Sequence, residues 1–125
     1  DIVKKIQSNP NEISLLGDGE QIRDYLYIDD VIDGLIQIST SGKPGEDYNL
    51  ASGNGIRLLD LAKQIAILMG FPDIKISLTG ESFPGDVPKW FGDINKIQNI
   101  GFHQNISLED GLLKTISWLN NKEKE

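Results

Sequence analysis

The sequence has 125 residues, of which 38% are hydrophobic, and this length fits one globular domain covering residues 1–125. Its net charge of −7 argues against non-specific nucleic-acid binding, which needs a basic surface. The absence of cysteine excludes disulfides and zinc–thiolate sites and fits a reducing compartment, and no apolar stretch reaches the roughly 20 residues that cross a bilayer. We therefore expect a cytoplasmic domain that binds neither nucleic acid nor membrane.

Apolar residues and turn residues alternate along the chain in a pattern typical of mixed helices and strands. In chain order, the pattern predicts a helix at 1–8, strands at 13–16 and 22–27, a helix from 29 or 30 to 41, a strand at 48–51, a helix at 58–69, a strand at 74–78, and helices at 93–99 and from 107 to 118 or 119. The clearest helix is the one at 58–69, because Leu58, Leu61 and Ile65 recur at helical spacing and Gly70 follows its end.

Side chains that accept hydrogen bonds from free backbone N–H groups mark several helix starts. Asp29 or Asp30 can cap one helix, and Asp93 can cap another. Ser107 with Asp110 resembles a capping box. We interpret these carboxylates as helix-stabilising groups and not as general acids or bases.

Five motifs then follow one another along the chain. They are Gly17-Asp18-Gly19-Glu20-Gln21-Ile22-Arg23-Asp24-Tyr25-Leu26-Tyr27-Ile28-Asp29-Asp30-Val31, Tyr48-Asn49-Leu50-Ala51-Ser52-Gly53, Pro84-Gly85-Asp86-Val87-Pro88 with Asp93 and Lys96, Ile100-Gly101-Phe102, and Ser107-Leu108-Glu109-Asp110-Gly111-Leu112. In this order they resemble the C-terminal part of the extended short-chain dehydrogenase/reductases, the NAD-dependent epimerase/dehydratase family. The resemblance covers residues 13–118 and implies an α/β fold, the small C-terminal substrate lobe of such an enzyme, with short strands, several helices and the Rossmann lobe absent.

The catalytic signatures of the family are missing from this sequence. No Gly-rich loop joins a strand to a helix, and Tyr25, Tyr27 and Tyr48 have no lysine four residues later. The resemblance places NAD or NADP and the Tyr-x-x-x-Lys pair in an N-terminal Rossmann lobe, and it implies a homodimer for the intact enzyme. We therefore expect no catalytic residue and no bound cofactor in this chain alone.

Arg23 is the strongest candidate for ligand binding, because a guanidinium presents a planar set of donors to diphosphate oxygens. The resemblance places an arginine at this position against the diphosphate of a nucleotide sugar. The alternative is a solvated arginine paired with Glu20 or Asp24. Asp86 matches a family aspartate that binds the ribose, and its alternative is a turn aspartate that accepts from nearby N–H groups.

The remaining substrate candidates come from a strand and a loop. Ser14, Leu15 and Leu16 match the family strand whose backbone meets the base, and the alternative is a plain core strand. Asn54 matches the loop beside the nucleotide, and the alternative is an ordinary turn asparagine.

Some aromatic positions bear on the site as well. Phe83 stands where the family often has a second arginine on the diphosphate, so Lys89, a group from the missing lobe or stacking of the phenyl ring would have to replace it. Trp90 and Phe91 are expected either to line the site or to fill the boundary between lobes.

His103 is the only histidine and has no second His or Cys nearby, so we expect no metal site.

These observations predict the substrate-binding part of an NAD(P)-dependent nucleoside-diphosphate-sugar epimerase or dehydratase. Its role is to position the nucleotide sugar for hydride transfer at the missing lobe. The chain starts at Asp1 inside a predicted helix, so we expect it to be a fragment of a longer protein. The alternatives are a non-catalytic nucleotide-sugar-binding or regulatory fragment and an inactive assembly subunit.

Overall fold

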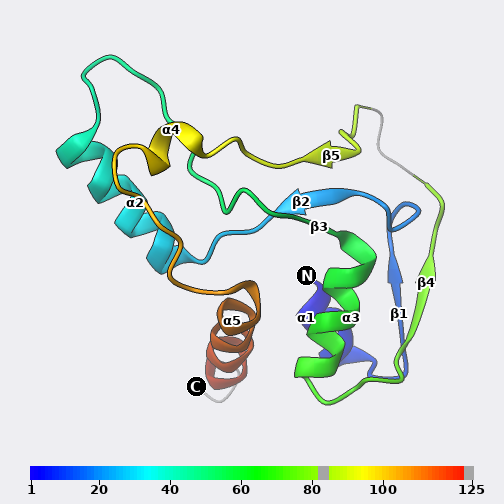
Figure 1. Ribbon diagram of the computed structural model, residues 1–125. Coiled ribbons are helices and arrows are strands. Elements are labelled where there is room, and N and C mark those ends of the chain that lie inside the picture. The colour runs from blue at the N-terminus through cyan, green and yellow to red at the C-terminus, as the bar shows by residue number, and fades with distance from the viewer. Residues whose placement is uncertain (82–84, 123–125) are drawn as a thin grey trace.

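The computed structural model describes residues 1–81 and 85–122, with side chains to residue 121. Helices and strands follow one another in this order: α1 (Ile2–Ser8), β1 (Glu12–Leu15), β2 (Ile22–Asp24), α2 (Ile28–Ser41), β3 (Gly55–Arg57), α3 (Leu58–Leu68), β4 (Lys75–Leu78), β5 (Lys89–Trp90), α4 (Asn95–Gln98) and α5 (Leu108–Lys122) (Figure 1). The fold is α/β with short strands and several helices, as predicted. In the described ranges, no helix is long and apolar enough to cross a membrane.

The strands form two small sheets. Strands β1 and β4 pair in parallel, with Ile13 opposite Ile76. In the second sheet β2 is central, antiparallel to β3 and parallel to β5. Strands β3 and β5 were not predicted, because runs of two or three exposed or half-buried residues carry no alternating pattern.

The main core lies where α1 and α3 pack beside β1, which Figure 1 shows on the side of the molecule away from α2. Ile6 of α1 and Ala62 of α3 are fully buried, and Leu15 of β1 is only 2% exposed. Ile116 of α5 belongs to the same cluster. The predicted apolar face of residues 58–69 is therefore the face that builds this core.

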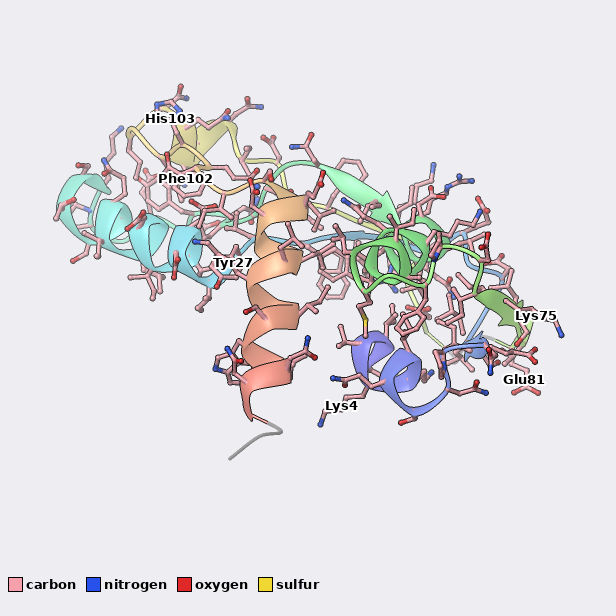
Figure 2. The ribbon with its side chains drawn as sticks, turned by 90° about the horizontal axis from the view of Figure 1, so that it is seen from below. Lys4, Tyr27, Lys75, Glu81, Phe102 and His103 are labelled. Carbon is pink, nitrogen blue, oxygen red and sulfur yellow. The ribbon has the colours of Figure 1, made fainter. Side chains whose placement is uncertain are left out.

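A second, smaller buried group joins α2 to α4 at the other end of the molecule. Ile97 of α4 is fully buried and Phe102 is 3% exposed. A Cβ atom at Gly34 of α2 would lie 3.2 Å from the Phe102 ring and closer still to Leu50, so only glycine lets these segments approach. Figure 2 shows Phe102 in this region and Tyr27 between α2 and α5.

One side of α2 is apolar and exposed. The predicted apolar helix does form, and four of its hydrophobic side chains are 49–57% exposed. They are Ile28, Ile32, Leu35 and Ile36, spaced so that they share one helix face. Within the described residues, no element covers this face.

The predicted strand at 48–51 is wrong, because this segment forms no strand and joins neither sheet. Side chains hold it instead. The Tyr48 hydroxyl accepts from the Lys43 N–H at 3.0 Å, the Lys96 ammonium lies 4.8 Å from the Tyr48 ring centroid, and the Asn49 amide donates to the Asp93 carbonyl at 3.1 Å. The strand predicted at 22–27 is likewise limited to residues 22–24.

The predicted cap of α2 is also wrong. The helix begins at Ile28 after Tyr27, with no side-chain cap bond. Asp30 is 1% exposed and accepts from the backbone N–H groups of Asn105 and Ile106 at 2.9 and 3.0 Å, so it ties the loop before α5 to α2. A carboxylate one turn into a helix still benefits from the helix dipole, but here it serves a tertiary contact.

The other two predicted helix starts are nearer the observed ones. Helix α4 begins at Asn95, whose N–H donates to the Asp93 carboxylate at 3.0 Å. The Ser107 hydroxyl oxygen accepts from the Asp110 N–H at 3.0 Å, as a capping residue does. The same hydroxyl donates to the Asp110 carboxylate at 2.6 Å, so the second bond of a capping box is replaced by a side-chain pair.

Candidate functional site

Arg23 and Asp86 form an ion pair at the edge of the three-stranded sheet. The Arg23 Nη2 atom lies 2.5 Å from Asp86 Oδ1, and the two side chains are 27% and 29% exposed. Arg23 Nη1 donates to the carbonyl oxygens of Ile22 and Val87, each at 2.8 Å. Two residues that were predicted to bind the same ligand are thus in direct contact, although they are 63 positions apart.

Pairing between β2 and β5 produces this contact. The Ile22 N–H donates to the Pro88 carbonyl at 2.8 Å, and Arg23 lies opposite Trp90 in the parallel register. The chain that enters β5 therefore passes the Arg23 guanidinium. The predicted alternative for Arg23 is wrong in its partners, because Glu20 pairs with Arg57 at 3.4 Å and Asp24 binds backbone and hydroxyl groups.

A hollow of about 530 Å³ opens beside Arg23. Its wall includes Asn49, Trp90, Phe91 and Asp93. The side chains of Trp90 and Phe91 are 68% and 54% exposed, so two largely exposed aromatic side chains share this hollow with Arg23. This combination of one cation and exposed rings suits a ligand with both an anionic and a flat or apolar part.

Asn54 lies on a different hollow, of about 480 Å³, which Tyr25 and Gln104 also line. The Asn54 amide donates to the Ser52 carbonyl at 3.2 Å, and its N–H donates to the Ser52 hydroxyl at 3.0 Å. These contacts are those of a turn asparagine.

Burial raises the pKa of the Tyr25 hydroxyl, and the charge of Arg23 opposes that shift.

The three candidates on the first strand have different surroundings. Leu15 is in the core, and the Ser14 carbonyl accepts from the Lys5 ammonium at 3.0 Å. Leu16 is 38% exposed and lies at the end of β1. There the Gly80 N–H donates to the Gly17 carbonyl at 2.9 Å, so the end of β1 adjoins the chain that continues from β4 toward Asp86.

Other candidates are placed away from this hollow or lie outside the described residues. Phe83 lies outside them. His103 is exposed, and Figure 2 shows it at the outer end of the molecule beside α4. In residues 1–81 and 85–122 no group of three or more His, Cys, Asp or Glu side chains could hold a metal ion.

Sequence reasoning missed Asp24, which it treated only as a possible partner for Arg23. The Asp24 carboxylate accepts four hydrogen bonds at 2.5–3.2 Å, from the Ser52 N–H and hydroxyl, the Gly53 N–H and the Gly92 N–H. The only sequence signal was its position beside Arg23 in a short strand. Neighbouring side chains of a strand point to opposite faces, so Arg23 and Asp24 do not form an ion pair with each other.

Comparison with known proteins places the chain in a family. A model of the NAD dependent epimerase/dehydratase family matches residues 1–51. The dTDP-glucose 4,6-dehydratase of Escherichia coli is 34% identical over 123 residues, which cover 89% of this chain and 34% of the dehydratase. The trifunctional UDP-glucose 4,6-dehydratase/3,5-epimerase/reductase of Arabidopsis thaliana is 33% identical over 82% of this chain and 15% of that protein.

Solved structures agree with the sequence matches. The UDP-glucose 4-epimerase of Thermotoga maritima, solved with UDP-glucose, is 28% identical with a TM-score of 0.80, and the match covers 98% of this chain and 38% of that one. This chain belongs to the NAD-dependent epimerase/dehydratase family. The chain spans between 15% and 38% of the length of these relatives.

Proposed function

We propose that residues 1–125 act as one nucleotide-sugar-binding domain of an NAD-dependent epimerase or dehydratase. The observation that carries the proposal is the ion pair of Asp86 with Arg23, a residue that also lines a hollow walled by Trp90. The resemblance in sequence assigned both charged residues to the same ligand, and the fold brings them within hydrogen-bond distance of each other.

The chemistry of each group fits one part of a nucleotide sugar. The Arg23 guanidinium can donate to diphosphate oxygens, and its charge persists at every physiological pH. The Asp86 carboxylate can accept from the ribose hydroxyls. Both side chains are partly exposed, so a ligand can reach their charged atoms and exchange the ion pair for bonds to itself. The chain has a net charge of −7, so the positive charge of Arg23 is needed to offset the repulsion of an anionic ligand.

The role of the domain in the reaction is positioning. The described residues do not fit a dinucleotide cofactor: no glycine-rich turn leads from a strand into a helix, since Gly17 and Gly19 lie between β1 and β2. Tyr25, Tyr27 and Tyr48 also have no lysine four residues on. NAD or NADP and the hydride transfer are therefore assigned to a second lobe, and this domain holds the diphosphate so that a sugar carbon faces that lobe.

Two features support a second lobe as the partner of this domain. The exposed apolar face of α2, with Ile32 and Leu35 at its centre, is the kind of surface that marks an interface. Residues 46–50 are irregular and join neither sheet. The matched relatives are much longer, since this chain covers 34% of one and 38% of another, and the dinucleotide-binding lobe of such an enzyme is the partner we assign to this face.

Calorimetric titration tests the proposal. The chain is titrated with UDP-, dTDP-, GDP- and CDP-glucose, with NAD⁺ as the control ligand. We expect one base to bind preferentially and Arg23→Ala to weaken that binding by about 1.5–3 kcal/mol, the range for hydrogen bonds to charged groups. The matched control is Arg57→Ala, which removes an exposed arginine that pairs with Asp60 and Glu20.

The names of the relatives include both UDP and dTDP, so the panel must decide the base. An Arg23→Ala variant that binds as tightly as the unmodified chain would remove Arg23 from the site. If NAD⁺ binds and the nucleotide sugars do not, the assignment of this chain to the sugar nucleotide is wrong.

A further inference from the structure

Asp24 connects three segments of the chain that lie around Arg23. Its Oδ1 atom accepts from the Ser52 N–H at 2.9 Å and from the Ser52 hydroxyl at 2.5 Å. Its Oδ2 atom accepts from the Gly53 N–H at 3.0 Å and from the Gly92 N–H at 3.2 Å. All four donors are neutral, and a carboxylate makes stronger hydrogen bonds to such donors than a neutral acceptor does.

Each of these segments carries part of a hollow wall. The Ser52 hydroxyl, which donates its proton to Asp24, accepts from the Asn54 N–H at 3.0 Å, so the Asp24–Ser52 contact continues to Asn54. Gly92 follows Phe91 at the end of β5, next to the Arg23 hollow. A Cβ atom at Gly92 would lie 2.7 Å from that of Ala51, which shows how tightly the two segments are packed against each other.

Backbone pairing alone would leave these walls weakly held. Strand β5 is two residues long, and its two register pairs with β2 involve Ile22 and Arg23. The residues from 46 to 54 contain neither a helix nor a strand. A short strand and an irregular loop have few internal hydrogen bonds, so their positions depend on the side chain that joins them.

We propose that Asp24 is a positioning residue of the nucleotide-sugar site, which fastens the Ser52–Asn54 loop and the end of β5 to the strand that carries Arg23. This inference rests on the proposed function for its ligand, and on the four hydrogen bonds of Asp24 for its mechanism. Asp24 itself contacts no ligand in this scheme. It keeps Trp90 and Phe91 in place before the ligand arrives, which lowers the ordering cost of binding.

The test is the isosteric variant Asp24→Asn. Its amide keeps one acceptor oxygen, but the NH₂ group would face N–H donors and cannot accept from them. Asp33→Asn is the control, because it makes the same change of charge at an exposed position of α2. The readouts are the Kd for the nucleotide sugar that the unmodified chain prefers, and hydrogen exchange of individual amides without ligand.

We expect Asp24→Asn to raise the Kd by about tenfold or more, the size seen when charged hydrogen bonds are lost, while Asp33→Asn leaves it unchanged. Exchange should accelerate at the amides of residues 52–54 and 92, and the buried amides of α3 should keep their protection. A general loss of folding would instead accelerate exchange in α3 as well. Unchanged affinity together with unchanged exchange at these loops would overturn the proposal.

A second variant keeps the test sharp if Asp24→Asn does not fold. Ser52→Ala removes the hydroxyl bond to Asp24 and the hydroxyl contact with Asn54 but keeps the Ser52 N–H bond to Asp24, and we expect a smaller change in the same direction. Where both variants fold, the double variant should lose less affinity than the two single losses added together, because both act through one contact. Additive losses would overturn the shared mechanism.

The outcomes also separate this inference from the proposed function. If the unmodified chain binds no nucleotide sugar, the proposed function fails. The fastening of the loops by Asp24 is then judged by exchange alone: faster exchange at 52–54 and 92 in Asp24→Asn supports it, and unchanged exchange overturns it.

Discussion

The Arg23 guanidinium and the Asp86 carboxylate bind each other, with Nη2 and Oδ1 2.5 Å apart. Each group therefore has a partner before any ligand arrives. A partly exposed pair of this kind contributes little to stability, because solvent screens it and ordering two side chains costs entropy. Its consequence is for binding: a diphosphate must draw Arg23 away from Asp86, or share it, before the site is formed.

This relationship predicts opposite effects on two ligands when Asp86 is neutralised. In Asp86→Asn the guanidinium no longer has an anionic competitor, so we expect inorganic pyrophosphate to bind more tightly. The nucleotide sugar loses a charged acceptor for its ribose, so the preference for the nucleotide sugar over pyrophosphate should fall by about tenfold. Calorimetric titration with both ligands measures the ratio.

Asp93→Asn serves as the control for charge, since Asp93 lies on the hollow that Arg23 lines and its carboxylate accepts from the Asn95 N–H. Equal weakening of both ligands in Asp86→Asn would show that Asp86 supports Arg23 and does not compete for it.

Buried and exposed isoleucines of α3 give a matched pair for the stability of the core. Ile65 is 5% exposed and Ile67 is 59% exposed, two residues apart on one helix. We expect Ile65→Ala to lower the free energy of unfolding by about 2–5 kcal/mol, through lost burial and the cavity left behind. Ile67→Ala should change it by no more than about 0.5 kcal/mol. Urea unfolding followed by circular dichroism measures both, and similar losses would mean that α3 packs on a different face.

Helix α3 and strand β4 could be predicted from the sequence, because a long helical period and a short apolar run between turn residues are strong local signals. The segment at 48–51 carries the apolar signal of a strand but has no strand beside it. Local pattern cannot show whether a pairing partner exists. Helix α2 shows the same limit, because the sequence pattern predicts a helix but does not show whether its apolar face is covered.

The candidate site divides in a similar way. Arg23 and Asp86 were chosen by resemblance to a family, and their contact depends on the pairing of β2 with β5, a strand too short to predict. The role of Asp24 could not be predicted, because an aspartate beside an arginine suggests an ion pair. Only the strand conformation of these residues shows that the two side chains point to opposite faces. Leu15 was a candidate only through its backbone, and its side chain belongs to the core.

The raised pKa of the Tyr25 hydroxyl predicts a loss of folding stability at alkaline pH. Burial raises the pKa of its hydroxyl in the folded chain, with Arg23 acting in the opposite direction. Above about pH 10 the unfolded chain releases this proton more readily than the folded chain, so the stability from the neutral hydroxyl is present below that pH and lost above it. We expect Tyr25→Phe to flatten this part of the profile. Urea midpoints measured from pH 8 to pH 11.5 test it, and an equally steep fall in the variant would assign the loss to other groups.

Trp90 supplies an optical test of where the ligand binds. The sequence has two tryptophans, and Trp90 lines the Arg23 hollow whereas Trp118 lies on α5. In the variant Trp118→Phe, all tryptophan fluorescence comes from Trp90, whose side chain is 68% exposed. A nucleotide sugar held by Arg23 should cover this ring, because bases and sugars pack well on exposed aromatic faces. We therefore expect a shift or quenching of emission that saturates at the same Kd as calorimetry gives.

The matched variant Trp90→Phe keeps an aromatic ring in the hollow and leaves Trp118 as the reporter. Its emission should stay constant as the ligand is added, while calorimetry still detects binding. A signal from Trp118 with none from Trp90 would place the ligand away from the Arg23 hollow. In that case Trp90 would take no part in ligand binding, even though Asp24 holds the end of β5 in place.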